Sequence, residues 1–136
     1  MSDRAVVFDV MGTLFDLAPV RRRLAELGAP GGALEAWFGR MLHSSAALTL
    51  VGEFHPFREI GKATLMTTLA QLDVESTRAD EVLQELGKLD AYPDASQALE
   101  LLEDAGVPAV TLTTAGGSTP RSCSSRQGFA PASSRY

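Results

Sequence analysis

A carboxylate that could act as a nucleophile stands at the end of the first apolar run of the chain. Asp9 directly follows residues 5–8, and Gly12 and Thr13 come within the next four positions. A carboxylate attacks well only when it is ionised, desolvated and held in a fixed position. The N–H groups of a glycine turn and a nearby hydroxyl can hold it in this way. The spacing is therefore compatible with covalent catalysis by Asp9, although for an aspartate judged alone an ordinary strand-end turn is the first interpretation.

Two short apolar runs would position this chemistry. Residues 5–8 form a continuous apolar stretch rich in branched side chains, which is typical of a strand buried on both faces of a sheet, and residues 107–112 indicate a second buried strand. The second run ends at Thr113, another hydroxyl residue. In open parallel sheets the chemistry lies beyond the carboxyl ends of the strands, so we expect Asp9 and Thr113 at the same edge.

Between the two runs the sequence predicts helices. Apolar residues recur at helical spacing in four segments between residues 16 and 89, and a further helix is expected from Pro93 to Gly106. The predicted apolar positions are Val20, Leu24 and Leu27; Leu34, Trp37, Phe38, Met41 and Leu42; Ile60, Leu65, Leu69 and Leu72; Val82, Leu83, Leu86 and Leu89; Ala98, Leu99, Leu101 and Leu102. This order predicts an α/β fold with an incomplete parallel-sheet core, residues 1–15 plus 90–113, and a helical insertion at 16–89.

Composition excludes several classes of protein. A net charge of −5 gives no reason to expect nucleic acid as a partner, and no apolar run approaches the roughly 20 residues of a membrane span. Because the start is polar we expect no secretory signal, and the single cysteine of these 136 residues gives no reason to expect an internal disulfide framework. We expect a cytoplasmic protein. Residues 21–23, three consecutive arginines, are interpreted as a solvated helix face.

The sequence changes character after Thr113. Residues 114–136 contain six serines and three arginines but no Asp or Glu, and they show neither a helical nor a strand period. One interpretation is a flexible, disordered basic tail. The other, which we favour, is that the segment is aberrant because the chain leaves its ancestral reading frame or is truncated there.

The string around Asp9 resembles the first signature of the haloacid dehalogenase superfamily. Residues 7–16, VFDVMGTLFD, deliver an aspartate from a strand to a glycine turn, and a threonine follows four residues later. Residues 91–107 resemble the segment that leads to the second signature, and residues 110–113 resemble that signature itself. The resemblance covers residues 4 to about 113. It implies a Rossmann-like core with an inserted helical cap domain.

The same resemblance implies roles for particular side chains. Asp9 would be the nucleophile, and Thr13 and Thr113 would be catalytic with it. The Thr113 hydroxyl would bind an oxygen of a substrate carboxylate or phosphate, with Thr114 beside it. Arg40 falls where the 2-haloacid dehalogenases place a cap arginine that receives the departing halide, although a solvated helix arginine is the alternative.

Met11 indicates which branch of the superfamily the chain resembles. Phosphatases of the superfamily usually carry a second Asp two residues after the nucleophile, as general acid and base, and methionine cannot transfer a proton. The 2-haloacid dehalogenase branch also lacks that Asp. We assign Met11 to the substrate-binding residues and predict hydrolytic dehalogenation of small 2-haloacids. This reaction implies an anionic small-molecule substrate and no cofactor.

Two alternatives stay open. The first is a Mg²⁺-dependent small-molecule phosphatase of the same superfamily, in which Asp9 would also bind the metal. The second is a non-catalytic, truncated product: the family's signature lysine and late acidic signature have no counterpart, because the last lysine is Lys88 and the last acid is Asp104. Weak or no activity and poor stability are therefore expected. A homodimer is also left open.

Overall fold

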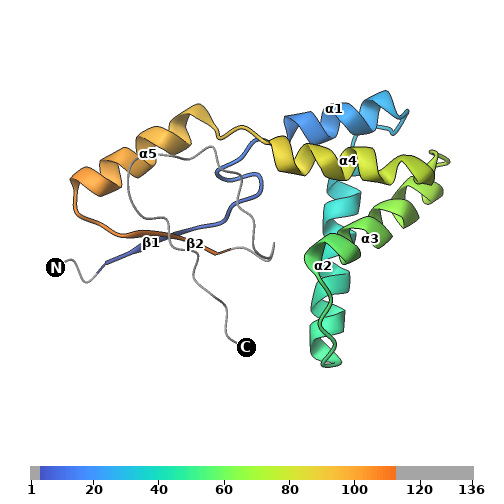
Figure 1. Cartoon of the computed structure of the whole chain (residues 1–136), viewed down its shortest axis with the longest axis horizontal. Coiled ribbons are helices and arrows are strands. Elements are labelled where there is room, and N and C mark those ends of the chain that lie inside the picture. Colours follow the sequence, from blue (N-terminus) through green and yellow to red (C-terminus); the bar gives the residue numbers. More distant parts are fainter. Residues whose placement is uncertain (1–3, 113–136) are drawn as a thin grey trace. The chain divides into compact units, whose positions relative to one another are not determined.

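The computed structural model describes residues 4–112 and divides the chain into two compact units (Figure 1). The described part of the first unit comprises residues 4–17 and 89–112. The second unit is Ala18–Lys88. The first unit contains a small parallel sheet and one helix, and the second is helical. The predicted α/β class is confirmed.

In the first unit, strand β1 (Val6–Phe8) pairs in parallel with β2 (Ala109–Thr111). Phe8 lies opposite Thr111 in the register. Helix α5 (Pro93–Asp104) precedes β2 and starts with a proline in its first turn, where the missing N–H removes no helical hydrogen bond. Gly106, with a φ of 64°, follows the helix in the left-handed conformation that commonly ends helices. The sequence predicted both ends of this helix.

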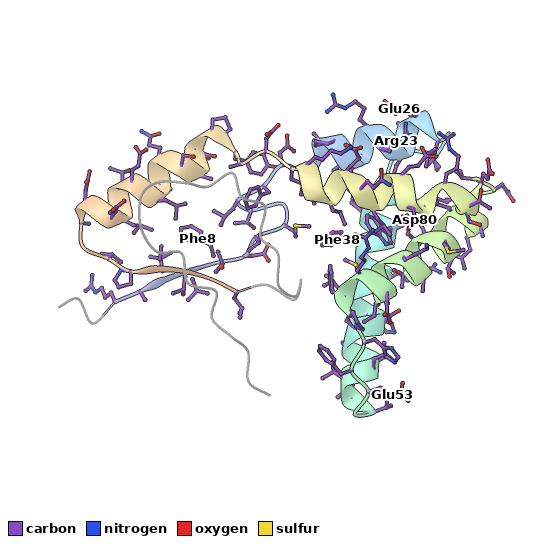
Figure 2. The ribbon with its side chains drawn as sticks, viewed as in Figure 1. Phe8, Arg23, Glu26, Phe38, Glu53 and Asp80 are labelled. Carbon is purple, nitrogen blue, oxygen red and sulfur yellow. The ribbon has the colours of Figure 1, made fainter. Side chains whose placement is uncertain are left out.

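The prediction that the strands are buried on both faces is wrong for the described residues. Val7 and Val110 lie opposite one another and are 59% and 36% exposed. Successive strand side chains alternate between faces, and α5 contacts the sheet on the side toward which Phe8 points (Figure 2). Leu101 is 63% exposed, so it does not belong to the packed face of α5 as predicted. One helix covers one face, and the other face stays open within residues 4–112.

The second unit consists of four α-helices and two short 3₁₀ turns. These are α1 (Ala18–Glu26), α2 (Ala33–Leu50), α3 (Phe57–Gln71), η1 (Ser76–Arg78), α4 (Ala79–Glu85) and η2 (Leu86–Lys88). The predicted fourth segment therefore forms a shorter α-helix with a 3₁₀ turn on either side. Within residues 4–112, no helix has both the length and the apolar character needed to cross a membrane.

The helices of the second unit pack around a closed core. Its fully buried large side chains are Val20, Trp37, Met41, Leu65, Leu69 and Val82. Trp37 Nε1 donates a hydrogen bond to the Gly61 carbonyl at 2.9 Å, and a Cβ on Gly61 would lie 3.4 Å from Met41 Sδ. The missing side chain at Gly61 thus allows α2 and α3 to pack closely. Leu42 is 47% exposed, because it lies one residue beyond the buried stripe of α2.

Candidate functional site

Asp9 lies directly after β1, at the carboxyl edge of the sheet. The Phe8 carbonyl accepts a hydrogen bond from the Leu112 N–H at 2.9 Å, so the two strands stay paired up to this edge. The Asp9 side chain is exposed, and its Oδ2 accepts a hydrogen bond from Thr13 Oγ1 at 3.0 Å. The structure therefore brings together the carboxylate and the hydroxyl that the sequence spacing paired.

The turn that joins Asp9 to Thr13 is built on Val10. The Val10 carbonyl accepts hydrogen bonds from the N–H groups of Thr13, Leu14 and Phe15, at 3.4, 3.0 and 3.2 Å. Gly12 has a φ of 80°, a left-handed conformation that glycine adopts without steric penalty. Val10, Leu14 and Phe15 are buried, whereas Asp9 and Thr13 are exposed. Apolar anchors thus hold the turn while its polar side chains face solvent.

The far end of this turn pairs with residues 90–92. The Asp16 N–H donates to the Asp90 carbonyl and the Tyr92 N–H donates to the Leu14 carbonyl, both at 2.9 Å. The Tyr92 phenol lies 3.4 Å from Asp16 Oδ1. Asp16 and Tyr92 lie in the two stretches that carry the resemblance, but the sequence assigned a role to neither and did not pair them, because a contact between residues 76 positions apart leaves no local pattern. The turn is therefore fixed at both ends.

Of the other residues predicted for the Asp9 site, only Met11 is among the described residues. Met11 is half-buried and forms an isolated bridge with Phe15, within the same turn. Leu112 is the last described residue, so Thr113 and Thr114 lie outside the described residues. Met11, Thr113 and Thr114 therefore stay predictions as substrate or catalytic groups.

Arg40 belongs to α2 in the second unit. It is half-buried, and its Nη2 donates a hydrogen bond to Gln71 Oε1 at the end of α3. This contact uses one N–H of a guanidinium group that has five. Arg40 is thus held by a neighbouring helix while keeping donor capacity, and its role toward a halide stays a prediction.

A separate charged cluster joins α1 to α4 within the second unit. Arg23 forms ion pairs with Glu26 at 2.7 Å and with Glu81, and Figure 2 shows Arg23 and Glu26 together on α1. Arg78 also binds both Glu81 oxygens, at 2.7 and 2.9 Å. The hydrogen bond from Arg78 is the main cause that lowers the pKa of Glu81. The interpretation of all three arginines as a solvated face is therefore wrong for Arg23, which is partly buried between acidic partners.

Among residues 4–112, no group of three or more His, Cys, Asp or Glu side chains is arranged to hold a metal ion. This part of the chain offers the Asp9 carboxylate to a Mg²⁺ ion, but it does not by itself form a metal site.

Known proteins resemble this chain in both sequence and fold. The family model for haloacid dehalogenase-like hydrolases matches residues 4–129. The "(S)-2-haloacid dehalogenase 4A" of Burkholderia cepacia is 36% identical over 107 residues, which are 76% of this chain and 46% of that protein. The chain thus spans about half the length of this curated relative.

Two solved dehalogenase structures also resemble this chain in fold. An L-2-haloacid dehalogenase matches with a TM-score of 0.75 and 28% identity, over 85% of this chain and 55% of that chain. The L-2-haloacid dehalogenase of Xanthobacter autotrophicus, with chloropropionic acid covalently bound, matches with a TM-score of 0.68 and 29% identity, over 83% of this chain and 47% of that chain.

The family match includes the whole Asp9 turn and runs past Thr113 to residue 129. It therefore also includes part of the stretch that the sequence analysis interpreted as out of frame, and that interpretation stays a prediction. The strand, the turn geometry around Asp9 and the sequence match agree: the chain belongs to the haloacid dehalogenase-like hydrolases.

Proposed function

We propose that this chain carries the nucleophile of a 2-haloacid dehalogenase, and that Asp9 is that nucleophile. The observation that carries the proposal is the exposed Asp9 carboxylate at the end of β1, with its Oδ2 held by Thr13 Oγ1 at 3.0 Å. A carboxylate fixed in this way can present an oxygen to a substrate in one orientation. Within residues 4–112 Asp9 is exposed, so the described residues provide the fixed position, and the bound substrate would have to displace the water around the carboxylate. The dehalogenase relatives, one with chloropropionic acid covalently bound, support this assignment.

The proposed reaction has two steps. An Asp9 carboxylate oxygen forms a bond to C2 of the 2-haloacid, the carbon–halogen bond breaks, and the halide leaves with the bonding electron pair. Water then adds to the Asp9 carbonyl carbon of the resulting ester, and the bond between that carbon and the oxygen attached to C2 breaks, so that the former Asp9 oxygen leaves with the product and the oxygen of water replaces it. A 2-hydroxy acid and a proton are released and the Asp9 carboxylate is restored. Neither step requires a redox partner.

We assign supporting roles to four further residues. Thr13 orients the nucleophile through its hydrogen bond. Thr113 and Thr114 follow directly after Leu112, which is paired to the strand that carries Asp9, so they are proposed to bind the substrate carboxylate. Arg40 is proposed to receive the halide, because a guanidinium group is a strong donor to anions.

Met11 favours dehalogenation over phosphate transfer. In phosphate ester hydrolysis the leaving oxygen needs a proton from an acid, and a thioether cannot supply one. A halide leaves without protonation, so a methionine at this position does not prevent its departure. The soft apolar side chain of Met11 also suits contact with an alkyl group.

Halide release tests the proposal. The full chain is incubated with (S)-2-chloropropionate, and chloride is measured with EDTA or with added Mg²⁺. We expect weak, metal-independent chloride release that Asp9→Asn abolishes, because the chain has no counterpart of the family's signature lysine and late acidic signature. Asp104→Asn, a matched change at the exposed end of α5, should leave it unchanged. Release of phosphate from p-nitrophenyl phosphate that depends on Mg²⁺ and on Asp9, without chloride release, would instead support the phosphatase.

A further inference from the structure

Tyr92 ties the Asp9 turn to the beginning of α5. Its N–H donates to the Leu14 carbonyl at 2.9 Å, and its carbonyl accepts a hydrogen bond from the Ala95 N–H at 3.0 Å. Its phenol donates to Asp16 Oδ1 at 3.4 Å in a partly buried contact. Ala95 is buried, so this end of the connection is anchored. One residue thus connects the turn, the Asp16 carboxylate and the helix.

The segment that Tyr92 holds is short. Phe15 and Ala91 form an antiparallel bridge, with the Asp16–Asp90 and Tyr92–Leu14 backbone hydrogen bonds on either side. An isolated two-stranded pairing is marginally stable in water. A side-chain contact across such a short pairing therefore changes how firmly residues 14–16 are held.

Movement of this segment reaches Asp9 through the turn. The N–H groups of Leu14 and Phe15 bind the Val10 carbonyl, and Val10 is the next residue after Asp9. Thr13, whose hydroxyl holds Asp9 Oδ2, precedes Leu14 in the same turn. A loosened pairing at residues 14–16 thus loosens both partners of the Asp9–Thr13 contact.

We propose that Tyr92 is a positioning residue for the nucleophile, acting through Asp16 and the turn rather than by touching the substrate. The inference rests on the proposed function of Asp9. The 3.4 Å contact is long for a hydroxyl–carboxylate hydrogen bond. We therefore expect a moderate effect, a roughly three- to tenfold slower formation of the Asp9 ester when the contact is removed.

The test compares three variants of the full chain. Tyr92→Phe removes only the hydroxyl, Asp16→Ala removes the acceptor, and Asp16→Asn keeps an acceptor oxygen. Asp104→Asn serves as the matched control. Two readouts are used: amide hydrogen exchange in the peptide spanning residues 10–16, and the rate of ester formation with (S)-2-chloropropionate in a single turnover.

We expect Tyr92→Phe and Asp16→Ala to raise exchange in residues 10–16 several-fold and to lower kcat with an unchanged KM. Peptides of α3 should exchange as in the parent chain. The Asp16→Asn variant, which keeps an acceptor oxygen, should keep most of the parent chain's protection in residues 10–16. Unchanged exchange in Tyr92→Phe, or an equal rise along the whole of α5 with a lower Tm, would overturn the proposal.

The two readouts separate the two hypotheses. If the parent chain forms no ester and releases no halide, the proposed function fails. The exchange measurement still decides whether Tyr92 fixes the turn, because it requires no substrate.

Discussion

The two units of the chain differ in how they use their buried apolar side chains. In the second unit, Trp37, Leu65 and Val82 are completely buried, in a core where helices pack on one another. In the first unit, Val7 is 59% exposed, and much of what is buried, such as Val10 and Phe15, lies in the Asp9 turn. Within residues 4–17 and 89–112, the first unit therefore concentrates its packing at the site of the proposed chemistry, whereas the second unit spreads it over a complete core.

This difference predicts which substitutions have the largest effect on stability in each unit. A helical core loses stability when a central side chain is removed, because the surrounding helices relax only partly into the cavity. A turn that is fixed by backbone geometry depends instead on the conformation of a few residues.

The largest effect is expected in the core of the second unit. Trp37→Ala should lower the free energy of unfolding by about 3–5 kcal/mol, because it leaves a cavity and removes the hydrogen bond to Gly61. Phe54→Ala is the matched control, because Phe54 is 93% exposed and the change should stay within about 0.5 kcal/mol. Urea denaturation followed by circular dichroism measures both. Equal losses would mean that the second unit lacks the packed core described above.

An intermediate effect is expected at the glycine of the nucleophile turn. Gly12→Ala should cost about 1–2 kcal/mol, because alanine is strained at a φ of 80°. Its Cβ would also lie 3.4 Å from Leu17 Cδ1. Gly39→Ala, in α2 with open space around it, should instead stabilise the chain by about 0.5–1 kcal/mol. A Gly12→Ala chain as stable as the parent would show that the turn tolerates a side chain, and that its geometry does not constrain Asp9.

The smallest effect is expected from the charged cluster on the second unit. The pKa of Glu81 in the folded state is lowered from 4.5, chiefly by the hydrogen bond from Arg78. A lowered folded-state pKa contributes stability above the unfolded value, and this contribution is lost as the pH falls through the folded value. Glu81→Gln should therefore reduce the stability difference between pH 7 and acid below pH 4.5.

Thermal melts of Glu81→Gln and of the parent chain across this pH range measure the difference. Glu100→Gln is the control, because Glu100 has no ion-pair partner within the described part of the chain. The effect is small, since exposed ion pairs are screened by water and salt. If the Tm of Glu81→Gln falls with acid as steeply as that of the parent, then Glu81 does not contribute to the pH dependence of stability.

Local patterns predicted the elements that depend on neighbouring residues. The four-residue spacing predicted the Asp9–Thr13 contact, because a glycine turn of this length brings the two side chains together. Pro93 and Gly106 predicted the bounds of α5, since each has a backbone preference that holds in any context. Helical spacing likewise predicted burial of Trp37 and Met41.

The sequence did not predict the features that depend on partners far away along the chain. Val7 and Leu101 are apolar, but their burial depends on what covers them, and nothing within residues 4–112 does so. Arg23 looked solvated because its partner Glu81 is 58 positions away. The contact between Asp16 and Tyr92 joins residues 76 positions apart. The type of a residue predicts only its average tendency to be buried or exposed. Which side chains it actually contacts depends on the fold.

The central claim is that Asp9 is the nucleophile, and mapping the covalent intermediate tests it most directly. The full chain is incubated with (S)-2-chloropropionate, quenched in acid, digested and analysed by mass spectrometry. We predict a carboxyethyl adduct on Asp9 itself in the parent chain and in Asp104→Asn, and no adduct at this position in Asp9→Asn. An adduct confined to Cys123, whose thiol haloacids can alkylate without an active site, or no adduct on Asp9 at any time, would contradict the claim.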